Sequence, residues 1–202
     1  METRPYALQN YLDSVHKAMT ADRSIPAASR AIERIFTALE SPSTRKTGEG
    51  ARLPVSGHLG DALAAVRAAS PSLAGVAKAF EALEPSLTWR RRSTAGLSAS
   101  DNFADGHANV MIAGPGGLED RNDVWVGATL MAPHVRYPDH RHGPEEVYLV
   151  LSSGYFRQGE GSWFEPGMGG ILYNEPGITH AMRSREAPLF AIWCLWVDRI
   201  IE

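Results

Sequence analysis

The sequence predicts an α+β protein, mainly β, in which a helical region over residues 1–86 precedes and packs on a β-barrel over residues 87–202. Two observations support this. Apolar residues recur at helical spacing in the first part. After Pro85, short runs rich in β-branched and aromatic residues are separated by Gly, Pro and Asn clusters. A double-sheet jelly roll fits these short strands and leaves an interior that can hold an ion.

Four helices are expected in the first part, from apolar residues spaced three and four apart. Ser24 is a candidate cap for the second helix, and Ser70 followed by Pro71 fits the start of the fourth. Residues 41–57, rich in Ser, Thr, Gly and Pro, predict an exposed loop. The helical runs cover residues 8–19, 28–39, 59–66 and 73–83.

The strands are expected where β-branched and aromatic residues concentrate, in residues 108–112, 122–131, 146–151 and 189–197. The run around Val124 is apolar at successive positions, which predicts a strand buried on both faces. Cys194 stands in the last run as the single cysteine of the chain, so we expect a buried free thiol.

Charge and hydropathy limit the possible partners. The 202 residues carry 20 basic and 23 acidic side chains, a net charge of −3, which gives no electrostatic reason to expect nucleic acid as a partner. No apolar run approaches the roughly 18 residues of a membrane span, and the amino terminus lacks a signal pattern. We expect a cytoplasmic monomer or homodimer that acts on a small molecule.

Histidines at a spacing suited to metal binding stand in the β part. His140 and His142 project to one face of an extended chain, Glu146 follows four residues later, and His180 supplies a third imidazole. This set suits divalent iron, zinc, manganese, cobalt or nickel and leaves coordination positions open. The spacing thus predicts one reactive divalent metal ion; chance placement of surface or core histidines is the simpler alternative.

The same residues carry a family resemblance. His140-x-His142-x3-Glu146 and the later Gly177-x2-His180 resemble the two motifs of the cupin superfamily. With Tyr137, Tyr148 and a helical amino-terminal half added, the chain resembles the cupin-type dimethylsulfoniopropionate lyases of marine bacteria. That resemblance implies a carbon–sulfur lyase, which uses a divalent metal and tyrosines to release dimethyl sulfide and acrylate.

The implied β-elimination needs a base and a group that holds the developing negative charge. A dication favours phenolate, so Tyr148, on the face of the ligands, is the candidate base, while Tyr137 orients the substrate carboxylate; the two roles are exchangeable. The sulfonium calls for aromatic faces, for which the candidates are Trp163, Trp193 and Trp196.

Two other functions fit the same residues. Three histidines and a carboxylate around iron also describe a cupin dioxygenase acting on a small thiol or enol. A non-catalytic cupin that binds a small molecule is the third candidate, although the helical half has no concentrated basic face of the kind found in DNA-binding segments.

Overall fold

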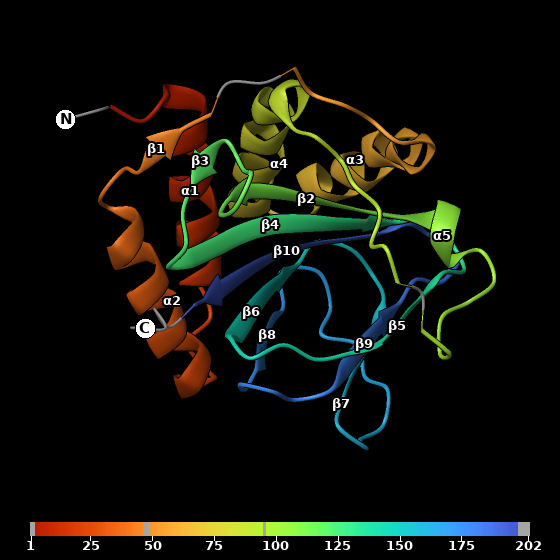
Figure 1. The fold of residues 1–202 in the computed structure, drawn as a ribbon. Coiled ribbons are helices and arrows are strands. Elements are labelled where there is room, and N and C mark those ends of the chain that lie inside the picture. Colours follow the sequence, from red (N-terminus) through yellow and green to blue (C-terminus); the bar gives the residue numbers. More distant parts are fainter. Residues whose placement is uncertain (1–2, 47–48, 95, 198–202) are drawn as a thin grey trace.

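The computed structural model describes residues 3–46, 49–94 and 96–197 (Figure 1). The helices precede most of the strands and cover one side of the barrel. They are α1 (Tyr6–Met19), α2 (Pro26–Leu39), the 3-10 helix η1 (Pro54–His58), α3 (Leu59–Ala69), α4 (Pro71–Leu83), the 3-10 helix η2 (Glu84–Ser86) and the one-turn α5 (Phe103–Gly106).

The strands form two sheets that face each other. The larger sheet has seven strands in the order β1-β3-β2-β4-β10-β6-β8, and the smaller has three in the order β5-β9-β7. Pairing is antiparallel except between β2 and β3. The strands are β1 (Thr44–Arg45), β2 (His107–Ala113), β3 (Glu119–Asp120), β4 (Val124–Met131), β5 (Arg136–His140), β6 (Glu145–Val150), β7 (Tyr155–Gln158), β8 (Ile171–Asn174), β9 (His180–Arg183) and β10 (Leu189–Trp196).

The large sheet separates two hydrophobic cores. One core joins the helices to the outward side chains of the sheet; there the ring of Phe80 meets those of Tyr11, Trp89 and Phe190 at 5.0–6.1 Å between centroids. The second core fills the barrel interior between the sheets. β4 therefore has buried side chains on both faces, as its sequence predicts.

The predicted cupin-type barrel preceded by helices is confirmed, and all four helical runs form helices. Ser70 caps α4 by accepting a hydrogen bond from the Leu73 amide. The expected cap at Ser24 is wrong: α2 begins at Pro26 after Ile25, and the Ser24 amide donates instead to Asp22 Oδ1 at 2.8 Å. Proline at the first helical position fixes the start of the helix without a side-chain cap.

The four predicted strand runs correspond to β2, β4, β6 and β10, and Cys194 is a buried free thiol on β10. The short strands β5, β7, β8 and β9 were not predicted, because they carry few β-branched residues. The division between residues 86 and 87 stays a prediction, since one core joins the helices to the large sheet. Among the described residues, no helix is long and apolar enough to span a membrane.

Candidate metal centre

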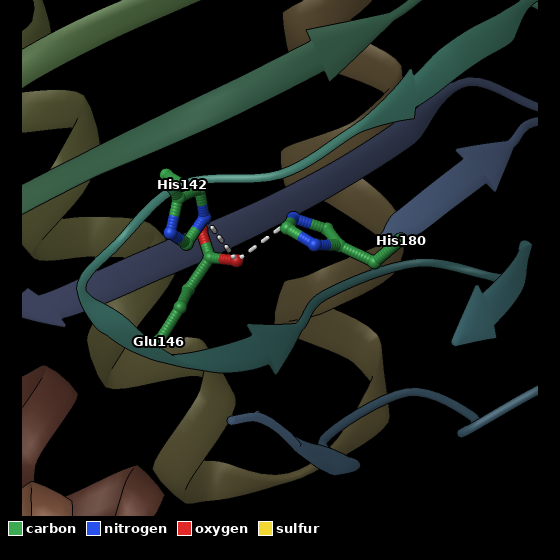
Figure 2. Close-up of side chains that lie close together, drawn as sticks. All are labelled: His142, Glu146 and His180. Atoms are coloured by element: carbon green, nitrogen blue, oxygen red, sulfur yellow. Dashed lines mark hydrogen bonds and ion pairs between the residues drawn. The ribbon is translucent and has the colours of Figure 1, made fainter. Parts of the chain in front are cut away.

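Three side chains from different parts of the barrel converge at one point (Figure 2). Glu146 lies on β6, His180 is the first residue of β9, and His142 lies in the loop between β5 and β6. The turn before β9 holds this loop in place: Gly177, at φ +76°, donates its amide hydrogen to the His142 carbonyl at 2.9 Å. Glycine adopts this left-handed conformation without strain.

The ligand atoms of these three residues lie within 4.8 Å of one another. His142 Nε2 and His180 Nε2 each lie 3.2 Å from the same Glu146 oxygen, Oε2. His180 Nε2 is buried and makes no hydrogen bond of acceptable geometry with that oxygen. A buried imidazole nitrogen without a hydrogen-bond partner lowers the stability of the fold when no metal is bound. The arrangement therefore fits a cation shared by the three groups.

His140 lies beside this group without joining it. Its ring centroid is 4.1 Å from that of His180, its cross-strand partner, and 6.4 Å from that of His142. The register of β5 and β9 is irregular between Tyr137 and His140. The structure thus brings three of the four predicted ligands within coordinating distance of one another and places the fourth at their side.

All three imidazoles are oriented by main-chain carbonyls. Nδ1 of His140, His142 and His180 lies 2.9, 2.8 and 3.0 Å from the carbonyl oxygens of Pro138, Pro144 and Ile178. A carbonyl only accepts, so each Nδ1 carries the proton and each Nε2 is the nitrogen available to a metal. Such hydrogen bonds opposite the ligand nitrogen are typical of metal-binding histidines, and they support the fit of this donor set to a divalent ion.

Burial and mutual contact determine the charge states of the group. Burial lowers the pKa of the His140 imidazole from 6.5 to about 3, helped by the neighbouring His180. Burial alone would also lower the pKa of His142, but hydrogen bonding to Glu146 and its charge outweigh it and raise that pKa. Burial would raise the pKa of Glu146, yet its two histidine partners hold it well below the usual carboxyl value. Glu146 is therefore an anion ready to bind a cation.

Two side chains missed by the sequence analysis support Glu146 from behind. Asn174 on β8 donates from Nδ2 to Glu146 Oε2 at 2.9 Å, and Gln158 on β7 donates from Nε2 to Asn174 Oδ1 at 2.7 Å. Asn174 is fully buried and faces Glu146 across the β6–β8 pair. These two amides hold the Glu146 carboxylate in its orientation. The sequence alone does not reveal them, because their positions depend on how the strands pair.

Both predicted tyrosines lie in the barrel interior. Tyr148, on β6, is 2% exposed, and burial, followed by the charges of Glu146 and Tyr137, raises its pKa well above the ordinary value. Tyr137, on β5, is 6% exposed, and its ring centroid is 4.9 Å from that of His140. The phenols therefore adjoin the histidines in an apolar setting.

A directed chain of hydrogen bonds ends at Tyr137. Trp193 Nε1 donates to Thr129 Oγ1 at 3.1 Å, Thr129 donates to Asn109 Oδ1 at 2.5 Å, and Asn109 Nδ2 donates to the Tyr137 hydroxyl oxygen at 3.2 Å. An indole N–H can only donate, so Thr129 accepts from Trp193 and its own hydrogen is free to donate to Asn109. The Tyr137 hydroxyl oxygen therefore accepts a hydrogen bond from Asn109, and the Tyr137 O–H is available to donate to another acceptor.

The three tryptophans named from the sequence lie in different surroundings. Trp193, on β10, is the cross-strand partner of Tyr148 and lines a cavity of about 470 Å³ together with Asn109. The indole of Trp163 has three guanidinium groups within 4.6–5.4 Å of its centroid, and that of Trp196 has Arg34 at 4.6 Å. Trp193 thus has contacts that connect it to both tyrosines.

Comparisons with known proteins identify the family of this chain. A family model described as dimethylsulfoniopropionate lyase matches residues 27–191. A protein of Cereibacter sphaeroides, provisionally named dimethylsulfoniopropionate lyase DddL, is 28% identical over 127 residues, 63% of this chain and 52% of that protein. The chain thus matches about half the length of this curated relative.

Solved structures share the fold. The crystal structure of the dimethylsulfoniopropionate lyase DddQ from Ruegeria pomeroyi DSS-3 has a TM-score of 0.69 and 23% identity, covering 98% of this chain and 95% of that one. A structure from a study of the lyases RdDddP and RnDddQII has a TM-score of 0.70 and 20% identity, covering 97% of this chain and 95% of that one. Since the family model spans well over half of the sequence, the chain belongs to the dimethylsulfoniopropionate lyase family.

Proposed function

We propose that this protein is a metal-dependent lyase that cleaves dimethylsulfoniopropionate to dimethyl sulfide and acrylate. The observation that carries the proposal is the convergence of His142, Glu146 and His180 beside two buried tyrosines, in a chain of the dimethylsulfoniopropionate lyase family. We assign His140 as the fourth ligand, because its Nδ1 is oriented by a carbonyl as in the other two histidines.

The reaction removes a proton from the carbon next to the carboxylate and breaks the bond between the β carbon and sulfur. The electrons of the C–H bond form the new double bond, and the sulfide leaves with the electrons of the C–S bond. When bound, a divalent ion acts as a Lewis acid that polarises the substrate carboxylate and favours phenolate over phenol nearby. Iron, zinc, manganese, cobalt and nickel all suit the donor set.

Tyr148 is the proposed base. In the absence of a metal ion its burial and the neighbouring Glu146 keep it protonated. It lies two residues after Glu146 on β6, on the same face of the strand, so the field of a bound cation would act on its phenol. The phenol oxygen takes the abstracted proton and has to release it to solvent before the next turnover.

Tyr137 orients the substrate. Its oxygen is occupied by the Asn109 amide, so its own O–H donates into the interior, where it meets the carboxylate of the substrate. Trp193 contributes an aromatic face toward the sulfonium, an attraction of about 0.5–2 kcal/mol. The guanidinium groups around Trp163 and Trp196 already provide those indoles with cations, so we favour Trp193 for this role.

The proposal is tested by incubating metal-reconstituted protein with dimethylsulfoniopropionate and measuring dimethyl sulfide in the headspace. His142→Ala should abolish the release of gas together with metal binding. Tyr148→Phe should abolish it while retaining the metal, and Tyr137→Phe should mainly raise KM. Absence of dimethyl sulfide from every reconstituted metal form of the wild-type protein would refute the assignment.

A further inference from the structure

The segment before β2 is attached to the barrel at two points. Arg90 exchanges backbone hydrogen bonds with Asn109 at 2.8 Å in both directions. The Arg92 amide donates to Nε2 of His107 at 2.9 Å. His107 is fully buried, and its Nδ1 contacts the Phe103 carbonyl, so both ring nitrogens have partners. The backbone at Arg92 is therefore held firmly over the barrel.

The guanidinium of Arg92 lies over the site. Its central carbon is 5.7 Å from the centroid of the Tyr137 ring, and its Nε donates a long hydrogen bond of 3.4 Å to Thr94 Oγ1. Within the described residues Arg92 takes part in no ion pair, whereas the adjacent Arg91 is paired with Asp105 at 2.7 Å on the surface. Arg92 is thus a cation beside Tyr137 that has no anionic partner among the described residues.

Arg92 also lies near a candidate ligand, because the Tyr137 ring beneath its guanidinium is 4.9 Å, between centroids, from the ring of His140. This half-buried guanidinium is not paired with a carboxylate among the described residues, so its N–H donors are available to an anionic ligand. Planar guanidinium matches carboxylate with two parallel hydrogen bonds.

We propose that Arg92 binds the carboxylate of the substrate and makes the site specific for small carboxylates. This inference rests on the proposed function, and it adds a residue that determines substrate specificity, supplied by the segment before β2. The zwitterion is then oriented between two ends: the carboxylate lies between Arg92 and Tyr137, and the sulfonium lies toward Trp193. A substrate with the same cationic end but an amide or ester in place of the carboxylate would be rejected.

The test compares Arg92→Gln and Arg92→Lys with the matched control Arg91→Gln, all metal-reconstituted. Arg92→Gln should raise KM for dimethylsulfoniopropionate about tenfold or more, as expected for a lost charge-assisted pair, with a smaller change in kcat. Arg92→Lys should recover part of the loss, and Arg91→Gln should match the wild type. A KM within twofold of the wild type for folded Arg92→Gln overturns the proposal.

A binding measurement separates this proposal from the lyase assignment. Propionate and its neutral isostere propionamide are titrated into each protein by calorimetry. The wild type should prefer propionate, and Arg92→Gln should lose at least tenfold of that preference while retaining its metal content. If the wild type releases no dimethyl sulfide but shows this pattern, the lyase assignment fails and the role of Arg92 stands. If both proteins prefer propionate over propionamide equally, or if the wild type does not bind propionate, the role proposed for Arg92 is overturned.

Discussion

Replacing Thr129 by valine should break the hydrogen-bond chain that ends at Tyr137 while leaving the shape of the interior almost unchanged. Thr129 is 2% exposed; it accepts from Trp193 and donates to Asn109, and valine has nearly its volume but no hydroxyl. Two hydrogen bonds are lost, each worth about 0.5–1.5 kcal/mol, so the free energy of unfolding should fall by about 1–3 kcal/mol. Without the Thr129 hydroxyl that donates to its Oδ1, Asn109 is no longer held with Nδ2 toward Tyr137, and lyase activity should fall about tenfold.

Urea unfolding and headspace dimethyl sulfide are the two assays, and Thr129→Ser is the matched control because it keeps the hydroxyl. In a Tyr137→Phe background, Thr129→Val should cause little further loss of activity, since there is no hydroxyl left to orient. Equal activities of Thr129→Val and Thr129→Ser, or full additivity with Tyr137→Phe, would show that the chain does not orient Tyr137.

Four further outcomes are expected. Gly127→Ala should lower both stability and activity, since an added Cβ would lie 2.3 Å from ring carbons of Trp193; circular dichroism and KM report the two effects. Phe80→Ala should cost about 3–5 kcal/mol in urea unfolding and leave a single transition, because its ring connects the helices to the sheet; two separate transitions would contradict the shared core. Burial would raise the pKa of Glu119, but two buried arginines hold it below the usual carboxyl value. The ionised carboxylate therefore stabilises the fold above about pH 4.5, and this stabilisation is lost as the pH falls. Glu119→Gln should flatten that part of the pH dependence of the unfolding free energy. Chelator treatment followed by a dication at about 100 times its Kd should raise the unfolding free energy by about 2.7 kcal/mol in the wild type and not in His142→Ala.

The helices and three of the candidate ligands could be predicted from the sequence, because both predictions depend on spacing within a short segment. Helical periodicity and the two-residue repeat of a strand are local properties, so His140, His142 and Glu146 could be recognised without the fold. The distances in the structure now show which of them converge, and their roles as ligands stay a prediction.

The residues that the sequence did not indicate act across strands. Asn109 and Thr129 are 20 positions apart and meet only because they are direct partners in the β2–β4 register. Arg92 is the last of three consecutive arginines, and nothing local distinguishes it from Arg91 in the sequence. In the structure it differs because its amide donates to the buried His107. Register and side-chain direction at such places follow from the whole fold.

The carbonyl contacts of the three imidazoles have a consequence for how the centre tolerates change. Every amino acid brings a main-chain oxygen, so exchanging Pro138, Pro144 or Ile178 removes no hydrogen-bonding atom and acts only through the path of the chain. Prolines at two of these positions restrict that path and thereby aim two of the rings. The orientation of the three imidazoles therefore depends on the conformation of the loops. Changes in these loops should alter the affinity of the centre for different ions more than changes in neighbouring side chains would.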